Sequence, residues 1–299
     1  MNEFDEESRR IFGHCRFSYF GRTDTGRDVE SLDHAKRLLW NKERMAVRFH
    51  LFEQITLPSI EYQTDVDFEF VITTSNEMPD VYQARLDDAV AHLSNVRVLR
   101  TSETQIGNAL RDVMYEASES SINGSVHFRL DDDDALCVQY IERLRVAAAA
   151  LQPRTMVTFS TGVLGHTEGD RAIHRTFEQH SIAIGLALVN APGDLRTPFQ
   201  IQHKAYGNSN PVFSDPTFTA FHYTRHTTNN TNGYEKVIHK DGGTVDIVSR
   251  NSLRAHPEFA EGAVTTDAAE ARIAEAFPYT TGPQLRDVIK ATLVPEELM

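Results

Sequence analysis

The sequence predicts an α/β protein in which a mixed, mostly parallel sheet is flanked by helices, with a helical extension at the C-terminal end. Between residues 16 and 160, short apolar runs rich in β-branched residues alternate with segments of helical periodicity. That alternation is typical of parallel strands joined by crossover helices. Hydrophobic residues make up 40% of the 299 and aromatic residues 9%, which suits one large packed domain with an appendage.

Five strands are expected here, because apolar and β-branched residues run together and end at turn-forming residues. They are residues 16–20, 68–75, 96–99, 125–130 and 156–160. Helical spacing of apolar residues predicts the segments between them, which are a helix from residue 42 onward and helices over residues 80–93, 104–118 and 135–151. Pro58 interrupts the first helix, so we expect it to break or restart there.

After Gly162 the pattern loosens into shorter apolar runs and turn-rich stretches that contain several histidines. Helical periodicity returns over residues 268–277 and 284–293. We therefore predict one domain over residues 1–250 and a helical C-terminal extension over residues 251–299.

The charge of the chain argues against nucleic acid as a partner. The formal net charge is −13 and the pI is about 5.4, and no segment gathers Lys and Arg into the basic stripe that binding to a phosphate backbone requires. An acidic protein that holds a phosphorylated ligand must supply positive charge locally, either from a few arginines or from a divalent cation.

The cellular compartment is expected to be the cytoplasm. The two cysteines, Cys15 and Cys137, lie far apart among apolar neighbours, which favours reduced thiols over a disulfide or a zinc site. The N-terminus is acidic, unlike a signal peptide, and no apolar run approaches the roughly 18 residues of a membrane span.

Four consecutive aspartates, residues 131–134, follow directly after the apolar strand 125–130. Ligand sites in open parallel sheets lie at the carboxyl ends of the strands. Adjacent carboxylates repel one another, and a hard divalent cation such as Mn²⁺ or Mg²⁺ relieves that repulsion while presenting a surface for phosphate oxygens. The run therefore predicts a metal-dependent site for a diphosphate.

Two other readings of this run were weighed. An acidic run can be a solvated loop or a helix N-terminus, in which case Asp133 or Asp134 would cap the helix expected from Ala135. An EF-hand calcium loop is disfavoured, because the required Gly and the Glu at its twelfth position are missing. Four aspartates at the end of an apolar strand favour the metal site.

Three stretches resemble a known family: residues 48–53 running into 57–60 and 63–64, residues 68–75, and residues 128–136. They are similar to the bacterial rhamnosyltransferases, which are related to glycosyltransferases of the GT-A fold, and weaker agreement extends through residues 222–229. The resemblance implies a GT-A-like, Rossmann-like domain, with a nucleotide-binding half over residues 16–160 and an acceptor half over residues 161–250. The donor would be a nucleoside-diphosphate sugar and the acceptor a hydroxyl group of a glycan or another molecule.

The resemblance also implies a set of metal ligands. Its Asp-x-Asp register places Asp131 and Asp133 on the ion, while the extra aspartates keep Asp132 and Asp134 in play. We nominate Asp131, Asp133 and Asp134 as ligands, and Asp131 and Asp132 also as donor-binding residues. In related enzymes a histidine from the C-terminal half completes the site. His222 is nominated for this role, with His226 as the alternative.

Further donor contacts are expected from Arg44, Arg48 and Arg129, because a guanidinium group binds a diphosphate or a base edge in a bidentate manner. Each of these arginines could instead form ordinary ion pairs on the protein surface. Thr74 and Ser75, at the end of strand 68–75, are expected to contact the base or ribose, with a simple turn as the alternative.

Sugar transfer with inversion needs a carboxylate that removes the proton of the acceptor hydroxyl. Glu168 and Asp170 follow the fifth strand and are the candidates, although either could be an ordinary loop carboxylate. Two other functions remain open, a metal-dependent phosphohydrolase or nucleotidyltransferase and a cation-dependent carbohydrate-binding protein. A homo-oligomer is compatible with the sequence.

Overall fold

The computed structural model describes residues 9–21, 31–180, 182–201, 207, 210–226, 238–240, 243–245 and 265–299. Its centre is a seven-stranded sheet with the strand order β10-β6-β9-β4-β1-β2-β3. The strands are β1 (Arg10–Arg16), β2 (Glu69–Ser75), β3 (Val96–Thr101), β4 (Ser125–Asp131), β6 (Met156–Thr158), β9 (Ala187–Val189) and β10 (Val212–Ser214). Within this sheet β9 runs antiparallel to both its neighbours and the other pairs are parallel, which confirms the mixed, mostly parallel sheet.

Helices cover both faces of this sheet. The helical elements are α1 (Leu32–Leu39), α2 (Lys42–Leu51), α3 (Leu57–Glu61), α4 (Asp80–Val90), α5 (Ile106–Ala109), α6 (Arg111–Glu119) and α7 (Tyr140–Ala149). Leu110, Val113 and Met114, at and after the junction of α5 and α6, pack with Val71 in a small cluster on one face. The large core, which contains Phe49, Phe52, Leu86 and Leu144 from α2, α4, α7 and the turn after α2, lies on the other face.

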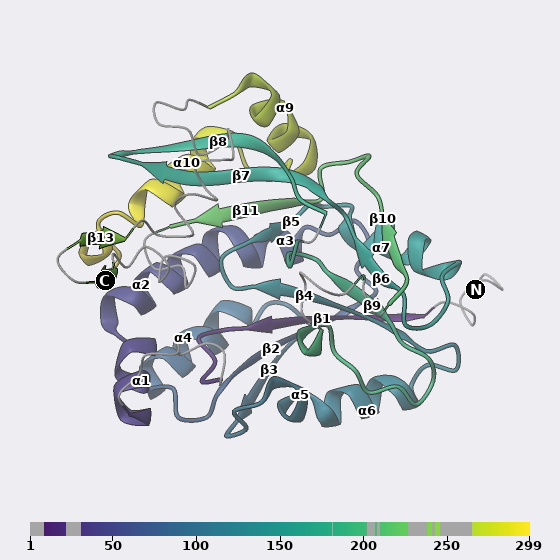
Figure 1. Cartoon of the computed structure of the whole chain (residues 1–299). Coiled ribbons are helices and arrows are strands. Elements are labelled where there is room, and N and C mark those ends of the chain that lie inside the picture. The colour runs from purple at the N-terminus through teal and green to yellow at the C-terminus, as the bar shows by residue number, and fades with distance from the viewer. Residues whose placement is uncertain are drawn as a thin grey trace.

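A second sheet lies across the large core (Figure 1). It contains β5 (Ala135–Leu136), β11 (Phe221–Arg225), β7 (Thr161–Glu168) and β8 (Arg171–Glu178), in that order. The sequence pattern after Gly162 did not reveal these strands, because polar residues such as His166 and Arg175 interrupt their apolar alternation. A separate hairpin pairs β12 (Ile238–Lys240) with β13 (Gly243–Val245).

The two C-terminal helices occur where the periodicity predicted them, as α9 (Asp267–Ala276) and α10 (Gly282–Ala291), and are followed by the short 3₁₀ helix η6 (Pro295–Leu298). Both helices pack on β7 and β8, on the outer side of the second sheet (Figure 1). Their apolar residues Ile273, Leu285 and Ile289 belong to the large core. The proposed boundary near residue 250 lies outside the described residues.

Three predicted element boundaries are wrong. The first strand spans residues 10–16 instead of 16–20, and Gly13 lies so close to Phe70 and Phe128 that a Cβ there would come within 2.3 Å of the Phe128 ring. The polar residues of this strand interrupt its apolar pattern, so the sequence did not indicate a strand there. The helix expected over residues 104–118 is divided at Leu110 into α5 and α6.

The helix expected from residue 135 begins only at Tyr140. Ala135 and Leu136 instead form β5, which pairs with Phe221 and His222 of β11. Asp133 and Asp134 therefore do not cap a helix, and that alternative reading is wrong.

The α-helix restarts next to Pro58, in agreement with the prediction. A turn of π-helix, η1 (Phe52–Thr56), joins α2 directly to α3, and Pro58 lies in the first turn of α3. Proline has no N–H to donate and its ring crowds the carbonyl one turn earlier. The wider π turn accommodates both defects, so the chain continues as one helical rod from Lys42 to Glu61.

Candidate active site

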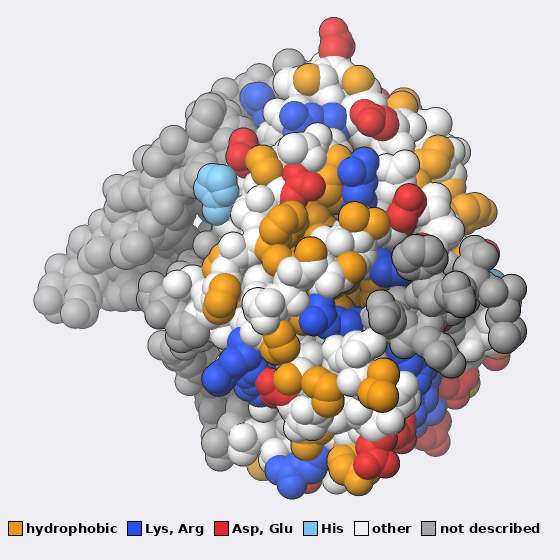
Figure 2. Space-filling model, turned by 90° about the vertical axis from the view of Figure 1, so that its right-hand side faces the viewer, with side chains coloured by type: hydrophobic (Ala, Val, Ile, Leu, Met, Phe, Trp, Pro, Cys, Tyr) orange, Lys and Arg blue, Asp and Glu red, His pale blue; other side chains and the backbone are white. Residues whose placement is uncertain are grey.

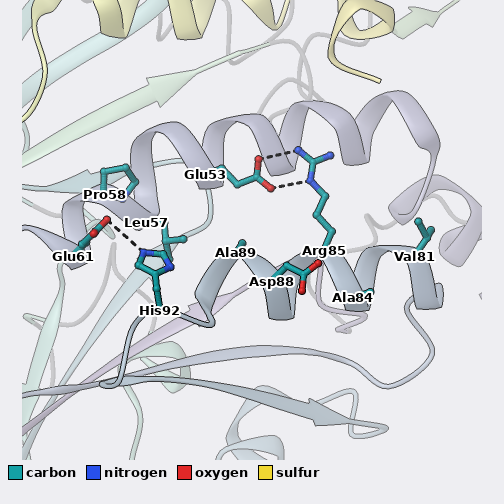
Figure 3. Close-up of a pocket in the computed structure, with 10 residues that line it drawn as sticks. All are labelled: Glu53, Leu57, Pro58, Glu61, Val81, Ala84, Arg85, Asp88, Ala89 and His92. Carbon is teal, nitrogen blue, oxygen red and sulfur yellow. Dashed lines mark hydrogen bonds and ion pairs between the residues drawn. The ribbon is translucent and has the colours of Figure 1, made fainter.

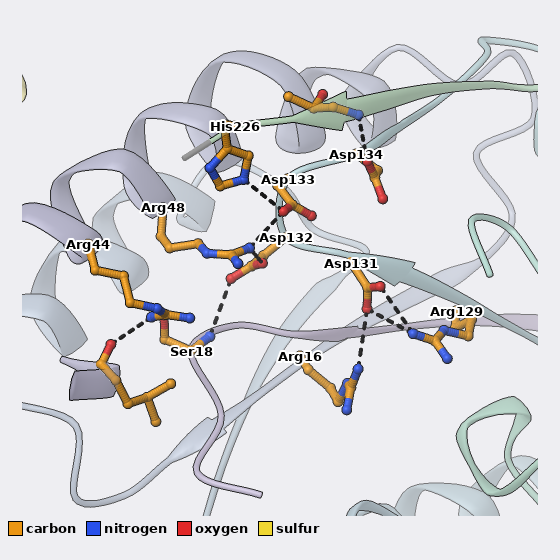
Figure 4. A network of polar contacts seen from close by, with 12 residues as sticks. Arg16, Ser18, Arg44, Arg48, Arg129, Asp131, Asp132, Asp133, Asp134 and His226 are labelled. Atoms are coloured by element: carbon orange, nitrogen blue, oxygen red, sulfur yellow. Dashed lines mark hydrogen bonds and ion pairs between the residues drawn. The ribbon is translucent and has the colours of Figure 1, made fainter. Parts of the chain in front are cut away.

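The four aspartates lie at the carboxyl edge of the large sheet (Figure 4). Asp131 is the last residue of β4, and Asp132, Asp133 and Asp134 form the turn that leads into β5. This turn lies between α2 and the end of β11, which bring an arginine and a histidine to the carboxylates. Asp132, Asp133 and Asp134 are each 4–5% exposed, so the run is a buried cluster and not a solvated loop.

Arg48, on α2, bridges two of the aspartates. Its Nη1 lies 2.5 Å from Asp132 Oδ1 and 2.9 Å from Asp133 Oδ2. The side chains of all three residues are 6–7% exposed. Buried charges persist only when they are paired and hydrogen-bonded, so this arginine accounts for much of the local charge balance.

Asp133 also contacts His226, which follows β11 directly. His226 Nε2 lies 3.0 Å from Asp133 Oδ2. Burial raises the pKa of Asp133, but Arg48 and the hydrogen bond from His226 outweigh it and hold this pKa below its usual value. Burial lowers the pKa of His226 despite Asp133, so a neutral His226 donates its Nε2–H to an ionised Asp133.

Asp134 lies in a different environment. Its Oδ1 accepts a hydrogen bond from the backbone N–H of Thr224 at 2.9 Å. Burial, together with the negative charge of Asp133, raises the pKa of Asp134 well above its usual value. The pKa values of Asp133 and Asp134, which are adjacent in this turn, are thus shifted in opposite directions, as is common at functional sites.

Asp131 is the most exposed carboxylate of the four, with 34% of its side chain accessible. Arg129 Nη2 lies 3.1 Å from both of its oxygens, and Arg16 Nη2 lies 3.5 Å from Oδ1. Burial opposes ionisation, but these two arginines lower the pKa of Asp131 to about 2. Both guanidinium groups also lie over the ring of Phe199, at 4.7 Å from its centroid, within the range of cation–π attraction.

Arg44 lies one turn before Arg48 on α2 and reaches the end of β1. Its Nη1 donates to Ser18 Oγ at 3.1 Å and to the carbonyl of Leu39 at 2.6 Å. Ser18 has a φ of 41°, a left-handed conformation that is unusual for a residue with a side chain. Its backbone N–H donates to Asp132 Oδ2 at 3.3 Å, which links this loop to the aspartates.

Two other nominated residues, Thr74 and Ser75, lie at the end of β2. Ser75 Oγ accepts from the backbone N–H of Glu77 at 3.2 Å, and Thr74 Oγ1 lies 3.6 Å from the sulfur of Met78, so both serve the turn after β2. Glu168 and Asp170 flank Gly169 at the tip of the β7–β8 hairpin, where Asp170 is exposed. Because Arg225 pairs with His166, this tip lies just beyond the level of His226.

His222 lies on β11 but belongs to another cluster. Its Nδ1 is 3.1 Å from Thr224 Oγ1 and its Nε2 is 3.2 Å from His174 Nε2. The ring is fully buried, and burial lowers its pKa to about 4. Both ring nitrogens are occupied by these two partners, so His226 and not His222 is the histidine that the fold brings to the aspartates.

The chemistry of the donors fits a hard divalent cation, because Mn²⁺ and Mg²⁺ prefer carboxylate oxygens and Mn²⁺ also accepts an imidazole. Their present arrangement does not enclose an ion. Over the described part of the chain, no three His, Cys, Asp or Glu side chains converge as a formed metal site. The Arg48 guanidinium lies where Asp132 and Asp133 face each other.

Sequence reasoning missed Arg16 and Ser18 as principal contacts. Arg16 stands opposite Asp131 in the β1–β4 register, and Ser18 acts through its backbone. The β1–β4 pairing joins residues 115 positions apart, so no local signal in the sequence marks it. His226 was recognised as an alternative, and only the end point of β11 decides between it and His222.

Two cavities lie away from the aspartates. One of about 570 Å³ opens between α4 and the helical rod of α2 and α3, and it is flanked by the Glu53–Arg85 and Glu61–His92 ion pairs (Figure 3). Another of about 420 Å³ lies at the amino ends of β1, β2 and β3. Neither includes an aspartate of the run.

The surface on the side of α7 and β10 shows no concentration of one charge. Figure 2 views this side and shows Lys and Arg interspersed with Asp, Glu and hydrophobic side chains. Exposed apolar residues, such as Val146 at 72% and Val212 at 42% exposure, belong to these elements. Among the described helices, none combines the length and the hydropathy needed to cross a bilayer.

The fold and the site together define an α/β protein whose polar centre lies at the carboxyl edge of a mostly parallel sheet, the position at which such sheets bind their ligands. The family model described as "Putative rhamnosyl transferase" matches residues 10–236. The chain belongs to this family, which confirms the resemblance found in the sequence. No curated protein matches the sequence.

Several solved structures resemble the chain at low similarity. Staphylococcus aureus TarS 1-349 in complex with UDP is 11% identical, with a TM-score of 0.40 over 76% of this chain and 62% of that chain. Its complex with UDP-GlcNAc is 10% identical, with a TM-score of 0.45 over 96% and 72%. GalNAc-T7 with UDP, GalNAc and Mn²⁺ is 11% identical, with a TM-score of 0.40 over 97% and 55%. The chain thus spans about three fifths of the first of these structures, and these likenesses are too distant to assign an activity.

Proposed function

We propose that the protein transfers a sugar from a nucleoside-diphosphate donor to a hydroxyl group of a glycan or another acceptor, with the help of Mn²⁺ or Mg²⁺. Membership of the family supports sugar transfer, and the family description suggests rhamnose. The observation that carries the proposal is the buried aspartate cluster at the carboxyl edge of the sheet, in contact with Arg48 and His226. Such a cluster suits a divalent cation, which can in turn hold the phosphate oxygens of a ligand.

The donor would lie over the ends of β1, β2 and β4. Asp131 is accessible there, and the adjoining guanidinium of Arg129 has further N–H groups to offer to a diphosphate or a base edge. Arg44, Arg48 and Asp132 line the same edge from the side of α2. Thr74 and Ser75 would contact the base or ribose through the turn after β2.

Asp131, Asp133 and Asp134 are the proposed metal ligands, with His226 in place of His222. A bound Mn²⁺ or Mg²⁺ would neutralise negative charge on the departing diphosphate. Asp133 is held ionised by its neighbours and is therefore ready to accept a cation. His226 already lies within hydrogen-bonding distance of it.

The transfer breaks the bond between the anomeric carbon and a diphosphate oxygen and forms a bond from that carbon to the acceptor oxygen. The proton of the acceptor hydroxyl must pass to a base. Glu168 and Asp170 are proposed for this step, since the hairpin tip that holds them lies beyond His226, where an acceptor could approach.

A panel of UDP-, GDP- and dTDP-linked sugars tests the function. The purified protein is incubated with each sugar, with Mn²⁺, Mg²⁺ or EDTA, and release of nucleoside diphosphate is measured. We expect one donor class to be consumed only with a divalent ion. Release of inorganic phosphate would instead indicate a phosphohydrolase, and glycan binding without any effect of nucleotide would indicate a carbohydrate-binding protein.

We also propose that the reaction takes place in the cytoplasm. Both cysteines are buried and free, and burial raises the pKa of Cys137 to about 12, as suits structural thiols in a reducing compartment. Whether the protein acts as a homo-oligomer is a separate question, which sedimentation of the purified chain would answer.

A further inference from the structure

Arg48 is the internal counter-ion of the aspartate cluster. It lies between Asp132 and Asp133, and the exposed fraction of its side chain is 7%. Burial lowers the pKa of Arg48, but the three neighbouring aspartates raise it above its already high usual value. An arginine in this position therefore stays charged at every accessible pH.

Arg48 contacts Asp133 Oδ2, an oxygen of a proposed metal ligand. Asp133 Oδ2 already receives Arg48 Nη1 at 2.9 Å and His226 Nε2 at 3.0 Å. A divalent ion of the Mg²⁺ class binds carboxylate oxygens at about 2.0–2.2 Å and carries its own shell of ligands. Its entry at this oxygen requires the Arg48 guanidinium to withdraw.

Withdrawal has an electrostatic cost unless another anion receives the guanidinium. Asp132 and Asp133 are both buried, and removing one partner of a buried ion pair leaves an uncompensated charge. A divalent cation replaces that charge on the aspartates, and a diphosphate provides new acceptors for Arg48. Both replacements become available when metal and nucleotide arrive together.

We propose that Arg48 is an internal competitor of the metal, which keeps the cluster neutralised without an ion and makes metal binding depend on the nucleoside diphosphate. The inference rests on the proposed function and deepens it. The two ligands should then bind with positive coupling, since each removes part of the cost of moving Arg48, and such coupling is reciprocal. Arg48 is therefore a positioning residue, which couples the binding of the metal to the binding of the nucleoside diphosphate.

The test measures binding of Mn²⁺ alone to the full-length protein by electron paramagnetic resonance, for wild type, Arg48→Met, Arg48→Lys and Arg85→Met. Arg85→Met is the matched control, because it removes an arginine from a carboxylate pair with Glu53 that lies outside the cluster. We expect Arg48→Met to bind Mn²⁺ about 10- to 100-fold more tightly than wild type, as removal of a unit charge at ion-pair distance predicts. Arg85→Met should match wild type.

Two further measurements keep the outcome decisive. Addition of UDP or GDP should raise the Mn²⁺ affinity of wild type more than that of Arg48→Met, and Mn²⁺ should raise the melting temperature of Arg48→Met more than that of wild type. If Arg48→Met does not fold, Arg48→Lys decides, because the lysine side chain ends one bond short of Arg48 Nη1, the atom that contacts both carboxylates. This variant should therefore also bind Mn²⁺ more tightly than wild type.

Mn²⁺ affinity that is unchanged or weaker in the folded Arg48 variants would overturn the proposal. The failure of the proposed function is distinguishable from this result. A wild-type protein that consumes no nucleotide sugar would refute the transferase assignment, while the titration with Mn²⁺ alone would still show whether Arg48 competes with the ion.

Discussion

His226 and Asp133 lie 93 residues apart in sequence and meet at the carboxyl edge of the sheet, with Nε2 and Oδ2 separated by 3.0 Å. The same carboxylate oxygen receives Arg48 from α2. Side chains from two elements that are remote in the chain, α2 and the end of β11, thus meet at one oxygen of Asp133, which makes this residue the natural target of the first experiment.

Asp133→Asn should abolish most of the transfer. An amide of the same shape keeps the packing but removes the negative charge that holds Arg48 and attracts a cation. We expect turnover of the donor identified in the screen to fall by about 10²-fold or more, in keeping with losses seen when a group stabilising transition-state charge is removed. Asp87→Asn, which removes an exposed carboxylate that pairs with Arg100, should leave turnover unchanged.

His226→Gln should change the affinity for metal, whereas His222→Gln should change the thermal stability. Loss of His226 should weaken Mn²⁺ binding in the presence of nucleotide by about 10-fold, the loss expected for a missing ligand or its orienting partner, with a small change in melting temperature. Loss of His222, which is buried against His174 and Thr224, should lower the melting temperature and leave metal affinity intact. Isothermal titration and thermal melting distinguish the two, and the reverse pattern would restore His222 as the ligand.

Stability should fall as the pH drops from about 6.5 to 4. Burial lowers the pKa of His222 to about 4 and that of His174 to about 2, whereas both rings titrate near 6.5 when unfolded. Below pH 6.5 the unfolded chain therefore binds protons that the folded chain excludes, and the free energy of unfolding decreases until the folded pKa values are reached.

The loss assigned to His222 alone is on the order of 1–3 kcal/mol. Urea denaturation at several pH values between 7 and 4 measures it. His222→Gln should have a shallower pH dependence than wild type, and an equal slope in both proteins would show that other groups cause the acid sensitivity.

Gly13→Ala should destabilise the large sheet. A Cβ at this position would lie 2.3 Å from Phe128 Cζ and 2.5 Å from Phe70 Cδ2, so the rings must shift. We expect a loss of about 1–3 kcal/mol in the free energy of unfolding. The double variant Gly13→Ala/Phe128→Leu should be less destabilised than the sum of the two single changes, and strict additivity would argue against this steric conflict.

Glu168→Gln and Asp170→Asn should identify the acceptor base. The variant that lacks the base is expected to lose about 10²- to 10⁴-fold in kcat, with little change in the KM for the donor. The other variant serves as its control, since both residues lie at the same hairpin tip. Normal kcat values in both would place the base elsewhere in the chain.

Much of the fold follows from local pattern. The strands β2, β3, β4 and β6 and the helices α4, α9 and α10 begin and end within a few residues of their predicted limits, because each carries its own apolar periodicity and its own turn residues. Where the local pattern was ambiguous, as at β1 with Gly13 and His14 or at β5 after the aspartates, pairing with distant strands decided the structure.

The sequence by itself determined where the candidate site lies, since an apolar strand that ends in four aspartates puts carboxylates at the carboxyl edge of a parallel sheet whatever the remaining chain does. Only the tertiary structure decided their partners. Arg48 lies 84 residues from Asp132, and the end of β11 selects His226 over His222. Such contacts depend on strand register and on helix position. The apolar periodicity of one segment does not encode how far that segment lies from another segment.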